Sequence, residues 1–132
     1  MKNDESKKNY TAKLHFLAFL KRRISRPVKY SYHGIKSCFK YEEAFRIEVY
    51  IGVLLLALAP FLADTWIELT ILISSVLVVL IVELINSAIE NTVDRISLDN
   101  HHLSARSKDQ GSAAVLLSII LLALIWISII LC

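Results

Sequence analysis

Three long apolar segments constrain what this chain can fold into more than any other feature of the sequence. They cover roughly residues 47–63, 69–89 and 113–132, and the third contains no charged residue. A helix of about 20 apolar residues spans the hydrocarbon core of a bilayer, and helices satisfy their own backbone polar groups there. With a hydrophobic content of 55%, the segments predict an all-α integral membrane protein whose three transmembrane helices lie within residues 42–132.

The region before the first apolar segment divides into a tail and an amphipathic stretch. Residues 1–12 are polar and basic, which is typical of a solvated tail. Within residues 13–41, apolar side chains recur at helical spacing from Leu14 to Ile24, with basic residues between them. This pattern predicts an N-terminal amphipathic helix on the membrane surface, which Pro27 is expected to interrupt or restart.

The basic residues are unevenly distributed, and this distribution predicts the orientation of the chain. Twelve of the fifteen lysines and arginines precede the first apolar segment, and the other three lie between the second and third. The positive-inside rule then places the N-terminus in the cytoplasm and the C-terminus on the periplasmic side. We interpret the basic residues as determinants of orientation and phospholipid contact rather than of nucleic-acid binding.

Polar residues that continue the second apolar segment are the clearest candidate site. Four of them, at spacings of three, four and four, share one face of a helix: Glu83, Asn86, Glu90 and Asp94. A carboxylate inside a membrane helix costs about 2.5–3.5 kcal/mol even on permissive insertion scales, so its presence indicates a function. Because three helices shield such a stripe poorly from lipid, we expect an oligomer in which the stripe faces a neighbouring subunit.

The acidic residues of this stripe suit two chemical tasks. Magnesium prefers one or two carboxylates together with phosphate oxygens of a substrate, and Glu90 with a glutamate from the first span could supply them. Glu83 lies about 10 Å deeper along the same helix, at a rise of 1.5 Å per residue. That depth suits a general base that acts on a lipid headgroup.

Simpler interpretations exist for several of these residues. Asn86 could serve only to join two helices, Asp94 could be a solvated helix end, and Lys108 could anchor the third helix at the interface. The sequence contains neither a phosphate-binding glycine loop nor a recognisable zinc motif. The adjacent His101 and His102 would diverge on a helix, so we expect no dinuclear zinc site there.

Four segments together are similar to a known family. They are Glu42-Glu-Ala-Phe-Arg-Ile-Glu48, Val82-Glu-Leu-Ile-Asn-Ser-Ala-Ile-Glu90, Val93-Asp-Arg95 and Ala105-Arg-Ser-Lys-Asp-Gln-Gly-Ser-Ala-Ala-Val115. In these segments the chain resembles the prokaryotic diacylglycerol kinases, over about residues 20–132. The resemblance implies a homotrimer in the bacterial inner membrane that transfers the γ-phosphoryl group of ATP to the hydroxyl of diacylglycerol and so makes phosphatidate.

The resemblance also implies roles for individual residues. Glu83 would be the catalytic base with Asn86 beside it, and the magnesium ligands would be Glu42 and Glu90. The residues implied to contact ATP are Arg23, Tyr30, Glu42, Glu90, Asp94, Asp99, Asn100, His101, Lys108 and Asp109. The residues implied to contact the lipid substrate are Arg23, Arg46, Glu83 and Ser112.

Two other functions compete with this interpretation. The related undecaprenol kinases of Gram-positive bacteria share the base and metal residues, but Glu-Ala-Phe-Arg and Asn-Ser-Ala in this chain favour diacylglycerol. An oligomeric ion or proton conduit would use the polar stripe to line a path. The polar residues gather at the predicted cytoplasmic end, however, which argues against a conduit across the whole membrane.

Overall fold

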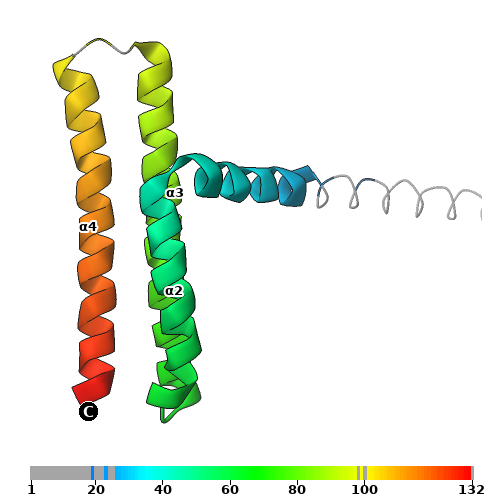
Figure 1. Cartoon of the computed structure of the whole chain (residues 1–132), viewed down its shortest axis with the longest axis vertical. Helices are drawn as coiled ribbons and strands as arrows, with labels where there is room; N and C mark the ends of the chain where they lie inside the picture. The colour runs from blue at the N-terminus through cyan, green and yellow to red at the C-terminus, as the bar shows by residue number, and fades with distance from the viewer. Residues whose placement is uncertain (1–18, 20–22, 24–25, 98, 100, 132) are drawn as a thin grey trace, which may run out of the picture. The chain divides into compact units, whose positions relative to one another are not determined.

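The structure, a computed structural model, describes residues 19, 23, 26–97, 99 and 101–131. Its labelled helices are α2 (Glu43–Leu62), α3 (Trp66–Ile96) and α4 (His102–Leu131), which Figure 1 shows. Residues 26–41 are helical as well, and no strand occurs among the described residues. The predicted all-α fold is therefore confirmed.

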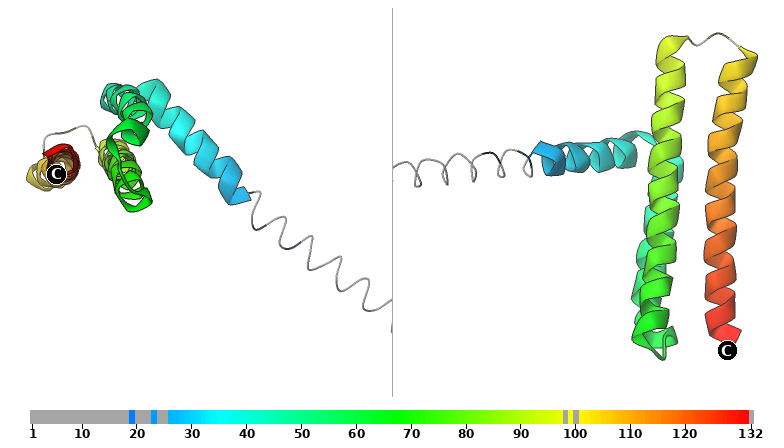
Figure 2. Two further views of the ribbon diagram at one scale, coloured as in Figure 1. Left: turned by 90° about the horizontal axis from the view of Figure 1, so that it is seen from below. Right: turned by 180° about the vertical axis from the view of Figure 1, so that it is seen from behind.

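The three labelled helices alternate in direction and surround a small core. Figures 1 and 2 show α4 running beside α3 in the opposite direction, and α3 packs against both α2 and α4. The buried residues at the centre are Ala59, Leu72, Val76 and Trp126. The Trp126 indole N–H donates to Ser75 Oγ over 3.1 Å, so a buried hydrogen bond joins α3 to α4 within the apolar region.

The turn between α2 and α3 has clear local causes. α2 ends at Leu62, two residues after Pro60, whose ring cannot donate a backbone hydrogen bond. The Thr65 hydroxyl accepts from the Glu68 N–H over 3.2 Å, and the Glu68 carboxylate accepts from the Asp64 N–H over 2.9 Å. This reciprocal arrangement resembles a capping box and begins α3 at a defined residue.

α3 and α4 extend beyond their apolar segments at one shared end. They contain 31 and 30 residues, whereas about 20 suffice to span the hydrocarbon core. The additional turns lie at the C-terminal end of α3 and the N-terminal end of α4. We call this end, made of residues 42–48, 83–97 and 101–112, the polar end.

The apolar surface of the helices fits a membrane. All three labelled helices are long and apolar enough to cross a bilayer. Large side chains in the middle of the helices remain exposed in the single chain: Val53 by 62%, Leu117 by 66% and Leu124 by 59%. Such a surface is unfavourable in water and compatible with lipid, so the chain has the character of a multi-pass membrane protein, as predicted.

Residues 1–37 and residues 38–132 form two separate compact units. In the first unit, the described residues 19, 23 and 26–37 are helical and exposed, Pro27 included. The tail and the other residues of the predicted amphipathic helix lie outside the described part of the chain. The placement of this helix on the membrane surface therefore stays a prediction.

Candidate active site

A group of acidic side chains surrounds Glu83 at the polar end. Glu83 is buried in α3, with 4% of its surface exposed. The charges of Glu90 and Glu42 act on it, and its own charge acts on Glu48 of α2, whose buried Oε2 has no hydrogen-bond partner. Among the described residues, none of these four side chains forms an ion pair with a basic side chain. Because like charges repel one another, holding these acids together costs free energy.

Asn86 connects the buried acid to the next turn of α3. Its Nδ2 donates to Glu90 Oε1 over 3.1 Å, which holds the Glu90 carboxylate against its own helix. Its Oδ1 is buried without a partner and faces Gly111 of α4. A Cβ atom at Gly111 would collide with this oxygen, so the absence of a side chain there permits the close approach of the two helices.

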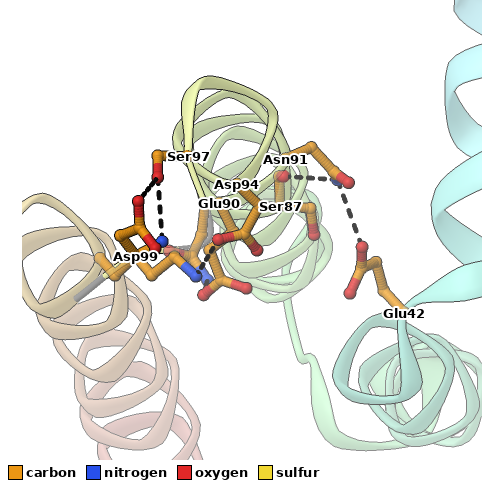
Figure 3. Close-up of polar contacts among 9 residues, drawn as sticks. Glu42, Ser87, Glu90, Asn91, Asp94, Ser97 and Asp99 are labelled. Atoms are coloured by element: carbon orange, nitrogen blue, oxygen red, sulfur yellow. Dashed lines mark hydrogen bonds and ion pairs between the residues drawn. The ribbon is translucent and has the colours of Figure 1, made fainter. Parts of the chain in front are cut away.

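Glu42 reaches α3 from the residue before α2. It occupies the N-cap position, but its side chain makes no capping hydrogen bond. Instead its Oε1 accepts from Asn91 Nδ2 over 3.3 Å, a contact that Figure 3 shows. Nearby, the Cys38 thiol donates to Ser87 Oγ over 3.4 Å. Burial is the largest influence on this thiol and raises the pKa of Cys38.

A cavity of about 420 Å³ opens between the end of α3 and the start of α4. Lys108 and Asp94 form an ion pair of 2.5 Å across it. Their side chains are 37% and 46% exposed, so the lysine can exchange its partner at small cost, since exposed ion pairs contribute about 0–1 kcal/mol. The residues that line the cavity are Val93, Asp94, Ser97, Asp99, His101, His102, Ser104, Ala105 and Lys108.

The two histidines at the mouth of this cavity lie together. As neighbours on a helix, His101 and His102 were predicted to diverge, but their ring centroids are 4.5 Å apart. His101 precedes α4 instead of belonging to it, so the helical rotation between neighbours does not apply. Its Nδ1 accepts from the Leu103 N–H over 3.3 Å, which helps to cap α4. No cluster of three or more metal-ligating His, Cys, Asp or Glu side chains occurs in the described part of the chain.

Several predicted ATP contacts gather in one place, while others do not lie in this cavity. Asp94, Asp99, His101 and Lys108 line it together. Asp109 is exposed on α4 immediately after Lys108. The two predicted contacts in the first compact unit, Arg23 and Tyr30, are exposed there, and Asn100 lies outside the described residues.

The predicted lipid contacts in the second unit occupy different surroundings. The Arg46 guanidinium donates to the backbone carbonyls of Phe39 and Lys40 over 3.4 and 3.1 Å, so it helps to terminate the preceding helix. Ser112 is exposed on α4 next to Gly111. A small apolar cavity of about 110 Å³ lies between α2, α3 and α4, with Glu48 in its wall.

The side chains at the polar end fit a divalent cation. Glu42 and Glu90 each present a carboxylate whose known hydrogen-bond partner is a neutral amide. Each also keeps an oxygen that has no hydrogen-bond partner among the described residues. Magnesium accepts one or two carboxylates of this kind and fills its remaining positions with water and phosphate oxygens. The chemistry of these two carboxylates suits Mg²⁺, and a metal at this end stays a prediction.

Some residues of the site did not emerge from the sequence analysis. Glu48 was named only as the last residue of a family segment, although an acid inside an apolar segment was itself a signal. Asn91 and Gly111 carried no such signal. Their roles depend on contacts with Glu42 and Asn86, which lie 49 and 25 positions away in the sequence.

Comparison with known proteins gives consistent relatives. The family model described as prokaryotic diacylglycerol kinase matches residues 29–130. Proteins named diacylglycerol kinase from Haemophilus influenzae, Escherichia coli K12 and Pseudomonas aeruginosa are 49%, 45% and 42% identical to the chain. The alignments cover 74%, 79% and 83% of this chain and 83%, 85% and 89% of those proteins.

Proposed function

Because the chain belongs to the prokaryotic diacylglycerol kinase family, we propose that it transfers the γ-phosphoryl group of ATP to the free hydroxyl of diacylglycerol and produces phosphatidate. The observation that carries this proposal is the burial of Glu83 among other acids in a helix that enters the membrane. A lipid hydroxyl remains near the bilayer surface while its acyl chains stay in hydrocarbon. A buried acid at the polar end of a spanning helix is placed to meet it.

Glu83 acts as the general base in this proposal. The hydroxyl oxygen of the lipid attacks the γ-phosphorus of ATP, and its proton passes to the Glu83 carboxylate. The bond between the γ-phosphorus and the bridging oxygen breaks, and ADP leaves with the electron pair. A positioned base of this kind typically contributes about 10²–10⁴-fold in rate. Asn86 stands one turn away and fixes Glu90.

Charge on the phosphates is balanced from two sides. Glu42 and Glu90 would hold Mg²⁺, which supplies charge neutralisation and alignment of the phosphates when bound. Lys108 would leave its pair with Asp94 and contact the phosphates, which the exposure of that pair supports. The volume of the adjacent cavity, about 420 Å³, lies within the range of ligand-binding pockets. We assign the nucleotide to it, with Asp99 and His101 in its lining and Asp109 next to Lys108 on α4.

The assembly and orientation follow from the same features. We infer a homotrimer in the bacterial inner membrane: the family resemblance implies three subunits, and the exposed apolar surface and the half-buried Glu90 of one chain favour neighbours. The N-terminus would lie in the cytoplasm, so the polar end would meet cytoplasmic ATP. The apolar cavity beside Glu48 would receive part of an acyl chain, which its lining of isoleucine, leucine and valine supports.

A substrate assay tests the proposal. The purified chain is incubated with radiolabelled ATP and Mg²⁺ in detergent, and diacylglycerol or undecaprenol is supplied in turn. We expect labelled phosphatidate from the first lipid and little product from the second, because Glu-Ala-Phe-Arg and Asn-Ser-Ala favour diacylglycerol. Product from undecaprenol alone would select the rival kinase activity. No product from either lipid, in a protein shown to be folded and oligomeric, would refute the kinase assignment.

A further inference from the structure

Glu42 is the N-cap residue of α2, but its side chain does not bond the first turn of that helix. The short acceptor side chains of Ser, Thr, Asp and Asn usually bond the free backbone N–H groups of the first helical turn from this position. The Glu42 side chain makes no such bond at the start of α2. Its carboxylate extends instead to Asn91 of α3, as Figure 3 shows. The position of this carboxylate is therefore set by a partner on another helix.

Asn91 is itself held in one orientation. Its Nδ2 donates to the Ser87 backbone carbonyl over 2.7 Å, one turn earlier on α3. The same nitrogen donates to Glu42 Oε1 over 3.3 Å. Because an amide nitrogen carries two hydrogens, one can be fixed on the helix while the other is presented to Glu42. The amide is thus oriented for the carboxylate before any ligand arrives.

A second contact runs parallel to the first. Cys38 and Ser87 each lie four residues before the members of the first pair, and the Cys38 thiol donates to Ser87 Oγ over 3.4 Å. The Glu42 N–H also donates to the Cys38 carbonyl over 2.8 Å, so both residues belong to one helical turn. Two side-chain contacts therefore tie the turn of residues 38–42 to residues 87–91.

We propose that Asn91 is a positioning residue that orients the carboxylate of Glu42 for a divalent cation. This inference rests on the proposed function, in which Glu42 and Glu90 hold Mg²⁺. Asn86 provides the corresponding contact to Glu90 over 3.1 Å, so each proposed ligand has one amide partner on α3. Partners of metal ligands fix the ligand geometry, and their loss typically costs about 10–100-fold in metal affinity or activity.

The test measures metal binding directly with Mn²⁺ as the probe. The full chain in detergent is titrated with Mn²⁺ in the presence of a non-hydrolysable ATP analogue, and free Mn²⁺ is followed by electron paramagnetic resonance. Two variants remove the amide, Asn91→Ala and Asn91→Leu, and they differ in bulk, so the test stands if only one of them folds. Thr92→Ala is the matched control, because the Thr92 hydroxyl bonds only its own helix at Ala88 O.

We expect the dissociation constant for Mn²⁺ to rise about 10–100-fold in both Asn91 variants and to stay unchanged in Thr92→Ala. The thermal midpoint without metal should match the wild type, since Asn91 is exposed. Wild-type Mn²⁺ affinity in a folded Asn91 variant would overturn the inference. Glu42→Ala distinguishes the metal site itself from the role of Asn91. If Glu42→Ala loses Mn²⁺ binding while Asn91→Ala keeps it, only the inference about Asn91 fails. If Glu42→Ala binds Mn²⁺ normally, the proposed metal site fails with it.

Discussion

Individual side chains at the polar end are constrained by what faces them on the next helix. Asn86 turns its Nδ2 to Glu90 and its buried Oδ1 to Gly111. The oxygen belongs to the end of a side chain that can rotate, so an added methyl group at Gly111 would move Asn86 more easily than it would separate the helices. The structure of the site is therefore more sensitive to this change than the stability of the fold.

The variant Gly111→Ala tests this difference. We expect phosphoryl transfer to fall at least tenfold, because the displaced Asn86 no longer holds Glu90. The midpoint of unfolding should change little, since alanine gains about 1 kcal/mol of helix propensity over glycine. Gly34→Ala is the control, because no atom lies within 4 Å of a Cβ built there. Full activity of Gly111→Ala in a steady-state kinase assay would contradict the role given to this contact.

Cys38 gives a second prediction at the level of one residue. Burial raises the pKa of its thiol, so a smaller fraction is thiolate at any pH below the raised pKa than in a free thiol. In a Cys132→Ser background, alkylation by iodoacetamide at pH 8 should be much slower than that of glutathione. It should become fast after unfolding in SDS. Mass spectrometry of the intact chain measures both rates, and rapid alkylation of the folded protein would contradict the buried position of Cys38.

At the level of helices, the sequence predicted where the helices lie better than it predicted which residues of different helices touch. The apolar segments located the three membrane helices because hydrophobicity and length are local properties of the chain. The stripe from Glu83 to Asp94 could also be predicted from the sequence, since the spacing of its residues lies within one helix. The contact between Glu42 and Asn91 was not, because it depends on the crossing of two helices whose residues are 49 positions apart. The same holds for His101, whose position before α4 depends on where that helix begins.

The buried hydrogen bond between α3 and α4 can be tested at this scale. Trp126→Phe removes the donor to Ser75 and keeps most of the aromatic packing. We expect it to lower the free energy of unfolding by about 0.6–1.7 kcal/mol, as measured for polar contacts between membrane helices. Trp126→Ala should cost more, about 3–5 kcal/mol, because it also leaves a cavity. Unfolding in mixed micelles with increasing SDS gives both values, and equal losses would show that the hydrogen bond rather than packing dominates.

At the level of the whole molecule, a single chain leaves many apolar side chains and some acidic ones without surroundings that suit them. Among the described residues, seven buried apolar side chains stand against a much larger exposed apolar surface. Glu83 is buried within the chain, but Glu42 and Glu90 are only half-buried and Asp94 is exposed. Lipid can cover the apolar surface, but it cannot solvate the acids. This difference is the physical reason for the proposed trimer.

Native mass spectrometry from mild detergent tests the assembly. We expect a species of three times the chain mass of 15.0 kDa, because neighbouring subunits would shield the polar stripe. Dissociation into single chains should abolish activity along with the trimer. A fully active monomer would contradict the need for neighbours.

The most direct test of the central claim compares the turnover of Glu83→Gln with that of Glu43→Gln. Both variants replace a glutamate carboxylate with an amide, but Glu43 is exposed on the first turn of α2. If Glu83 is the general base, its variant should lose about 10²–10⁴-fold in kcat while binding ATP normally, and Glu43→Gln should keep wild-type turnover. Wild-type turnover in a correctly folded Glu83→Gln variant would contradict the account.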